Sequence, residues 1–199
     1  LPVFVGYDTL STTATLTKYR KIKTKDGEFF HLVLDQTPCY AESGGQVGDR
    51  GRILFDAGSI PILNTVREND LIIHITDSLP ADPSATLTVE VDRQKRIATA
   101  SNHSATHLLH AALRKVLGSH VEQKGSLVDE NRLRFDFTHF ARLTREEIAE
   151  TERIVNEKIR ENIISGEQRE VPIAKAKEMG ATALFGEKYG EFVRVIAFD

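Results

Sequence analysis

Hydrophobic and polar positions follow two different patterns along the chain, and the change falls near Asp92. Up to residue 91, short runs of β-branched and aromatic residues are separated by turn sequences rich in Gly, Asp and Pro. These runs cover residues 12–16, 29–34, 51–55, 71–75 and 87–91. Short strands at this spacing are typical of a small all-β domain. We therefore predict an antiparallel β-barrel over residues 1–91.

Beyond Asp92 the apolar residues recur at helical spacing. Residues 93–117 are compatible with one long helix, which Asn102 could divide, and Gly118 is placed as its C-cap. Residues 121–128 and 132–137 then alternate in the manner of a half-buried hairpin.

A capping box at Thr144–Glu147 opens a second helix, which extends to about residue 162. Its expected inner face carries Ile148, Val155 and Ile159. A strand at 171–173, a short helical piece ending at Gly180 and a strand at 192–198 complete the chain. We predict an α+β unit over residues 92–199, and hence an α+β fold for the whole chain.

The composition is that of a soluble globular protein, with 199 residues, a formal net charge of −3 and 40% hydrophobic residues. Cys39 is the single cysteine, so we expect a reducing cytoplasm and a structural role for the thiol. The sequence contains neither a membrane-spanning run nor a signal-peptide pattern. Because the chain opens on Leu1 and closes on Asp199 directly after a strand, we expect it to be a piece of a longer protein.

His103 and His107 are four residues apart, so a helix would place both imidazoles on one face, where they could bind one metal ion. His110 follows on the same side. The alternative is that these histidines are polar residues at a helix edge or in a hydrogen-bonded core. Zinc needs about four ligands, and no further ligand stands out nearby. A zinc protease is disfavoured because Ser104, not Glu, follows His103.

Two further segments have a composition suited to binding. Residues 37–49 form a turn-rich stretch in which Gly44-Gly45-Gln46 would let the backbone approach a ligand closely, although a simple hairpin turn is an alternative. Residues 93–126 carry six basic residues against one acidic residue, a balance that suits a polyanion. A solvated helix face is the alternative for this basic segment.

Together these motifs resemble the editing domain of alanyl-tRNA synthetases. The resemblance rests on residues 102–114 and 120–126, on the Gly-Gly-Gln stretch at 37–49, and on Leu184–Gly190, which occur in family order. The opening residues 4–8 also agree. The resemblance implies a β-barrel followed by the α+β domain shared with threonyl-tRNA synthetases. It further implies hydrolysis of tRNA(Ala) mischarged with serine or glycine.

The resemblance also implies a zinc site and a parent enzyme. The family's zinc ligands match His103 and His107, together with a Cys and a His from a Cys-Gly-Gly-Thr-His segment that this sequence does not reach. We therefore expect this chain alone to bind zinc weakly or not at all. The parent enzyme would attach alanine to tRNA(Ala) with ATP and magnesium, which belong to its aminoacylation site.

By resemblance, Thr37 would hydrogen-bond the serine hydroxyl that alanine lacks, while Gln123 and Gln46 would orient water or the terminal adenosine. Our candidate tRNA contacts are Gly44, Gly45, Arg93, Arg96, Arg114 and Lys124. Two alternatives stay open: a free-standing hydrolase that edits the same tRNA in trans, and a non-catalytic module that only docks tRNA.

Overall fold

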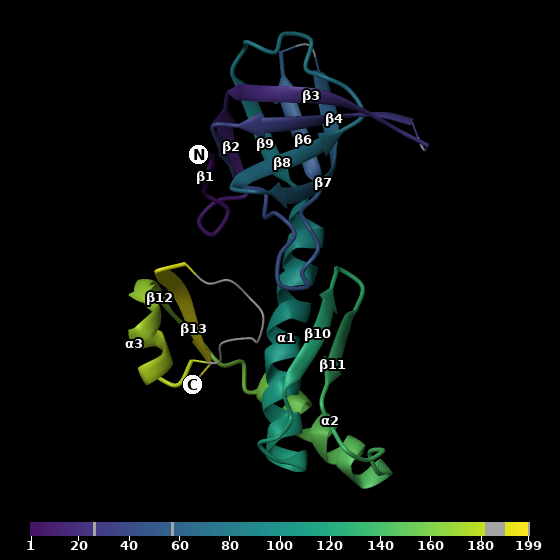
Figure 1. Cartoon of the computed structure of the whole chain (residues 1–199), viewed down its shortest axis with the longest axis vertical. Coiled ribbons are helices and arrows are strands. Elements are labelled where there is room, and N and C mark those ends of the chain that lie inside the picture. The colour runs from purple at the N-terminus through teal and green to yellow at the C-terminus, as the bar shows by residue number, and fades with distance from the viewer. Residues whose placement is uncertain (26, 57, 182–189, 199) are drawn as a thin grey trace. The chain divides into compact units, whose positions relative to one another are not determined.

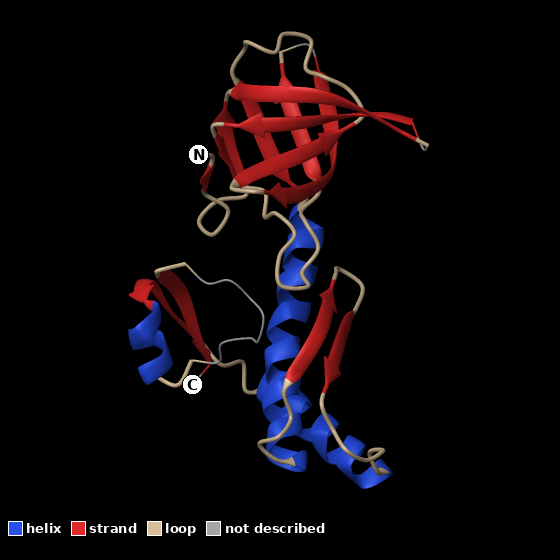
Figure 2. Cartoon of the chain, in the orientation of Figure 1, coloured by secondary structure: helices blue, strands red, loops and turns tan. Residues whose placement is uncertain are grey.

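In the computed structural model, every regular element before residue 92 is a strand, as the hydrophobic pattern predicts (Figure 2). The structure describes residues 1–25, 27–56, 58–181 and 190–198. The strands of this part are β1 (Val3–Phe4), β2 (Ser11–Ala14), β3 (Leu16–Thr24), β4 (Gly27–Leu34), β5 (Gln36–Thr37), β6 (Gly51–Phe55), β7 (Gly58–Glu68), β8 (Leu71–Thr76) and β9 (Leu87–Val91).

Seven of these strands form one antiparallel sheet in the order β2-β9-β6-β7-β8-β4-β3 (Figure 1). The period-2 pattern explains its core: Leu87, Val89 and Val91 of β9 point inward, and all three are buried. The predicted antiparallel arrangement is confirmed. The pairings of the described residues run from β2 to β3 in open order, so closure into a barrel stays a prediction.

Two strands of this sheet are absent from the sequence prediction. β3 is an edge strand whose residues are mostly exposed, so it lacks the alternation of apolar residues that reveals a strand. β7 contains Pro61, which has no N–H to donate and argues against a strand in a sequence. The buried Ile60 and Ile62 flank Pro61 and hold β7 on the core.

The remaining elements combine helices and paired strands. They are α1 (Arg93–Leu117), β10 (Gln123–Val128), β11 (Leu133–Phe137), α2 (Arg145–Arg160), β12 (Ser165–Pro172), α3 (Ile173–Glu178) and β13 (Phe192–Phe198). Helix α1 is continuous, without a break at Asn102. β10 pairs with β11, and β12 pairs antiparallel with β13. The predicted α+β class is therefore confirmed.

Helix α2 begins with the predicted capping box. Thr144 Oγ1 accepts from the Glu147 N–H, and the Glu147 carboxylate accepts from the Thr144 N–H. The predicted inner face is wrong at Ile148 and Ile159, which are exposed. Val155 is half-buried, and the buried isoleucine is Ile154. The buried residues of this helix are Thr151 and Ile154, so the buried face lies to one side of the face that carries Ile148 and Ile159.

Contacts divide the described residues into two compact units. The first holds residues 1–103 and 127–133, and the second holds residues 104–126 and 134–199. The predicted domain boundary near residue 92 stays a prediction. No described helix combines the length and apolar character needed to cross a bilayer.

Candidate functional site

The Gly-Gly-Gln segment forms a tight turn in the first unit. The Ser43 N–H donates to the Gln46 carbonyl (3.2 Å), and the Gln46 N–H donates to the Ser43 carbonyl (2.9 Å). Gly44 and Gly45 have φ values of 59° and 82°. Two consecutive positive φ angles are the signature of a type I′ turn, which glycine adopts without strain. The hairpin-turn alternative is therefore right for the local backbone, and it leaves open what the turn contacts.

This turn is anchored at its base by residues far away in the sequence. The Val47 N–H donates to the Val128 carbonyl (3.0 Å), and the Val128 N–H donates to the Gly45 carbonyl (2.8 Å). Gly48 lies against β7, where a Cβ atom would come within 1.8 Å of the Thr65 carbonyl oxygen. The loop is therefore held at both ends by backbone contacts, so Gln46 has a defined position.

The side chain of Gln46 meets the helix histidine. His103 Nδ1 lies 2.6 Å from Gln46 Oε1, and Gln46 is only 7% exposed. Because an amide oxygen only accepts, a hydrogen bond between these two atoms needs the proton on Nδ1. Burial lowers the pKa of His103, so its imidazole is neutral near pH 7. The structure thus brings together two of the sequence-predicted motifs, which lie 57 residues apart.

The other histidines of α1 have different surroundings. His107 is exposed and lies in the second unit. His110 is buried there, with Nε2 3.4 Å from the Val121 carbonyl oxygen and its ring centroid 5.1 Å from that of Phe135. His110 is therefore a hydrogen-bonded core histidine. Among the residues that the structure describes, no three His, Cys, Asp or Glu side chains gather to hold a metal ion.

Thr37 lies in the core of the first unit and contacts a histidine that the sequence analysis missed. His74 is fully buried, and its Nδ1 donates to the Leu32 carbonyl (3.2 Å). Its Nε2 therefore accepts from Thr37 Oγ1 (2.8 Å), which in turn accepts from the Cys39 N–H (3.0 Å). Burial lowers the pKa of His74 to about 4. No local pattern distinguishes this histidine from its neighbours in β8.

Cys39 follows Thr37 into the same core and is fully buried. Burial raises the pKa of its thiol to about 12, so the thiol stays protonated at neutral pH. A protonated, inaccessible thiol is a poor nucleophile and a poor metal ligand. This buried environment agrees with the structural role that the sequence predicts for Cys39.

Arg96 has the most extensive contacts of the candidate tRNA-binding cations. Its guanidinium forms a buried ion pair with Asp49 and donates to the carbonyls of Gly6 (2.8 Å) and Pro38 (2.8 Å). The Tyr40 N–H also donates to Asp49 (2.6 Å). These contacts join α1 to the opening loop and to the segment that leads into the Gly-Gly-Gln turn.

The remaining predicted site residues are closer to the surface. Arg93 is exposed in the first unit, and in the second unit Arg114 donates to the Val121 carbonyl (3.2 Å). Lys124 is exposed and pairs with Glu122 (3.2 Å). Gln123 lies in β10, where its amide donates to Ser126 Oγ (3.2 Å). The predicted segment Leu184–Gly190 lies outside the described residues except for Gly190.

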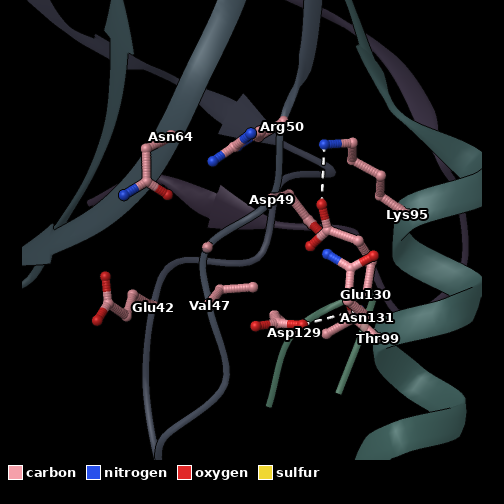
Figure 3. A pocket seen from close by; sticks show the side chains of 11 residues that line it. Glu42, Val47, Asp49, Arg50, Asn64, Lys95, Thr99, Asp129, Glu130 and Asn131 are labelled. Carbon is pink, nitrogen blue, oxygen red and sulfur yellow. Dashed lines mark hydrogen bonds and ion pairs between the residues drawn. The ribbon is translucent and has the colours of Figure 1, made fainter. Parts of the chain in front are cut away.

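A polar cavity of about 400 Å³ opens in the first unit beside the loop that carries the Gly-Gly-Gln turn (Figure 3). Lys95 Nζ lies 2.9 Å from Glu130 Oε1 across it. The sequence analysis missed this cavity because four separate segments supply its walls. The lining residues are Glu42, Val47, Gly48, Asp49, Arg50, Asn64, Lys95, Thr99, Asp129, Glu130 and Asn131.

Two comparisons relate the chain to known proteins, one over its first half and one over almost its whole length. Residues 2–96 match the family model described as tRNA synthetases class II (A). Over 98% of its length the chain is 61% identical to an alanine–tRNA ligase of Cytophaga hutchinsonii and 56% identical to one of Bacteroides thetaiotaomicron. It covers 22% of each of these relatives, so it spans about a fifth of their length.

Proposed function

We propose that this chain is the part of an alanine–tRNA ligase that hydrolyses tRNA(Ala) mischarged with serine or glycine. It is similar to a segment that makes up about a fifth of the length of such enzymes. The observation that carries the proposal is the contact between His103 and Gln46, since it joins the His-x-x-x-His and Gly-Gly-Gln motifs in one place. Attachment of alanine, with ATP and magnesium, would belong to another part of the enzyme. The cytoplasm, where tRNA is charged, would be its compartment.

Two histidines of α1, His103 and His107, could supply part of a zinc site. The imidazole nitrogens of His103 and His107 are ligands of the kind that zinc prefers. His107 follows one helical turn later. Two imidazoles hold zinc weakly, so tight binding would need the Cys and His of the segment implied by the resemblance. When bound, zinc would polarise the ester or position the 3′ end of the tRNA.

An aminoacyl ester is already an activated bond, so the protein has to position a water molecule and select the substrate. Gln46 and Gln123 are the amides that would orient this water or the terminal adenosine. Thr37 would recognise serine through its hydroxyl oxygen. Because its proton is already donated to His74, Thr37 could only accept from the serine hydroxyl, and alanine offers no such donor. Thr37 is fully buried, so this role requires that substrate binding uncover it.

Exposed cations and the Gly-Gly-Gln turn would bind the tRNA backbone. Arg93, Arg114 and Lys124 carry charge at the surface, and Gly44 and Gly45 let the backbone approach a phosphate or sugar closely. Arg96 belongs to the same predicted set, although its guanidinium is already bonded to Asp49, Gly6 and Pro38.

The decisive test is serine release from Ser-tRNA(Ala) by the full-length protein that carries this chain. We expect the variant with His103→Ala and His107→Ala to release serine about 100-fold more slowly or worse, while alanine attachment is retained. His120→Ala is the matched control, because it removes an exposed imidazole outside the two motifs. Unchanged serine release in the double variant, with tRNA binding retained, would instead favour the non-catalytic docking module.

A further inference from the structure

Gln46 is buried, and the backbone on both sides of it is held by hydrogen bonds. It is 7% exposed, and the residues on either side of it bond to the Val128 backbone at 2.8 and 3.0 Å through Gly45 and Val47. Its own backbone closes the turn with Ser43. The position of Gln46 is therefore set by the fold of the first unit, and from this position its amide reaches His103.

This contact has one chemical consequence for His103. A neutral imidazole carries a single proton, and an acceptor at 2.6 Å from Nδ1 holds it there. The Nε2 atom is then the nitrogen with the lone pair. In the other tautomer Nδ1 and Gln46 Oε1 would place two lone pairs against each other, which is repulsive at this distance.

We propose that Gln46 is a positioning residue that fixes His103 as the Nδ1–H tautomer and thereby makes Nε2 its metal-binding nitrogen. This inference rests on the proposed function only in taking His103 as a zinc ligand. It assigns to Gln46 a different task from orienting water or adenosine, because Gln46 acts through the histidine ring.

The first measurement needs no metal and no tRNA. Long-range ¹H–¹⁵N correlation spectra of the zinc-free 199-residue chain distinguish a protonated imidazole nitrogen from an unprotonated one, and His103→Asn identifies the signal. We expect His103 to be protonated on Nδ1. A spectrum in which Nε2 carries the proton overturns the proposal, since the Gln46 amide would then present its NH₂ group to Nδ1.

The second measurement is zinc affinity of the full-length protein, obtained by competition with a chromogenic chelator. Gln46→Leu should weaken binding about 10- to 100-fold, because the ring loses its orienting acceptor. Gln46→Glu keeps an acceptor at this position and should retain most of the affinity. Gln94→Leu, at an exposed position of α1, is the matched control and should bind zinc as the unaltered protein does.

The outcomes separate the two proposals. Equal zinc affinity in Gln46→Leu and the unaltered protein would overturn the role of Gln46, even if serine release depends on His103. Zinc affinity as weak in Gln46→Glu as in Gln46→Leu would also overturn the role of Gln46, provided circular dichroism shows that both variants are folded. Conversely, the predicted tautomer and zinc affinities combined with absent serine release would refute the editing function and leave the positioning role standing.

Discussion

Acidification should destabilise the first unit through His74. This imidazole is fully buried, and its two ring nitrogens are occupied by the Leu32 carbonyl and the Thr37 hydroxyl. Neither neighbour is charged, so nothing compensates a positive charge on the ring. Burial accordingly lowers its pKa from 6.5 to about 4.

The sign and size of the effect follow from proton linkage. Below pH 6.5 the unfolded chain binds a proton at His74, while the folded chain does not until the pH falls to about 4. The free energy of unfolding therefore decreases as the pH drops through this window. At about 1.4 kcal/mol per pH unit, the complete loss is about 3 kcal/mol, most of it reached by pH 4.5.

Urea denaturation of the 199-residue chain at several values between pH 7 and pH 4.5, followed by circular dichroism, measures this loss. His74→Asn removes the titrating group, so its unfolding free energy should depend less on pH by about 2–3 kcal/mol over the range. Carboxylates contribute equally to both proteins and cancel in the comparison. His31→Asn is the comparison variant: the pKa of this partly buried histidine is also lowered, so its removal should reduce the pH dependence in the same direction but by less. Identical pH dependence in His74→Asn and the unaltered chain would refute the reasoning.

Three further predictions concern stability and reactivity. Arg96→Leu leaves Asp49 buried without its cation and should lower the free energy of unfolding by about 3–5 kcal/mol in urea denaturation; a loss below about 1 kcal/mol would contradict a structural ion pair. Thr144→Ala removes the N-cap of α2 and should cost about 1 kcal/mol in the same assay, whereas no change would mean that the capping box is dispensable. The Cys39 thiol should react with a chromogenic disulfide reagent at pH 7 no faster than the chain unfolds, and rapid labelling of the native protein would show that the thiol is accessible.

Local patterns in the sequence were sufficient to predict several elements and motifs. The alternation of Leu87, Val89 and Val91 predicts β9, and the same alternation buries it. The apolar spacing after Arg93 predicts α1, and the capping box at Thr144 predicts the start of α2. In each case the signal lies within a few residues, because strand and helix periods are properties of the local backbone.

Other features depended on neighbours that the local pattern does not contain. β3 is an edge strand that is held mainly by pairing with β4, so its own residues have little apolar periodicity. The prediction of the buried side of α2 was wrong, because the surface that the helix packs against decides which of its isoleucines is buried. The burial of Cys39, in contrast, was predictable from the residue type, because a free cysteine is usually a core residue. In the structure Cys39 is fully buried.

The sequence by itself determined which residue types were available for the site: the two histidines of α1, the Gly-Gly-Gln turn and the threonine that precedes it. Only the tertiary structure decided that Gln46 bonds to His103, that Thr37 rests on His74 and that Arg96 pairs with Asp49. These pairs are separated by 57, 37 and 47 residues. Hydrogen bonds of this kind act over about 3 Å, so they form only after the sheet and helix have packed and brought distant segments together.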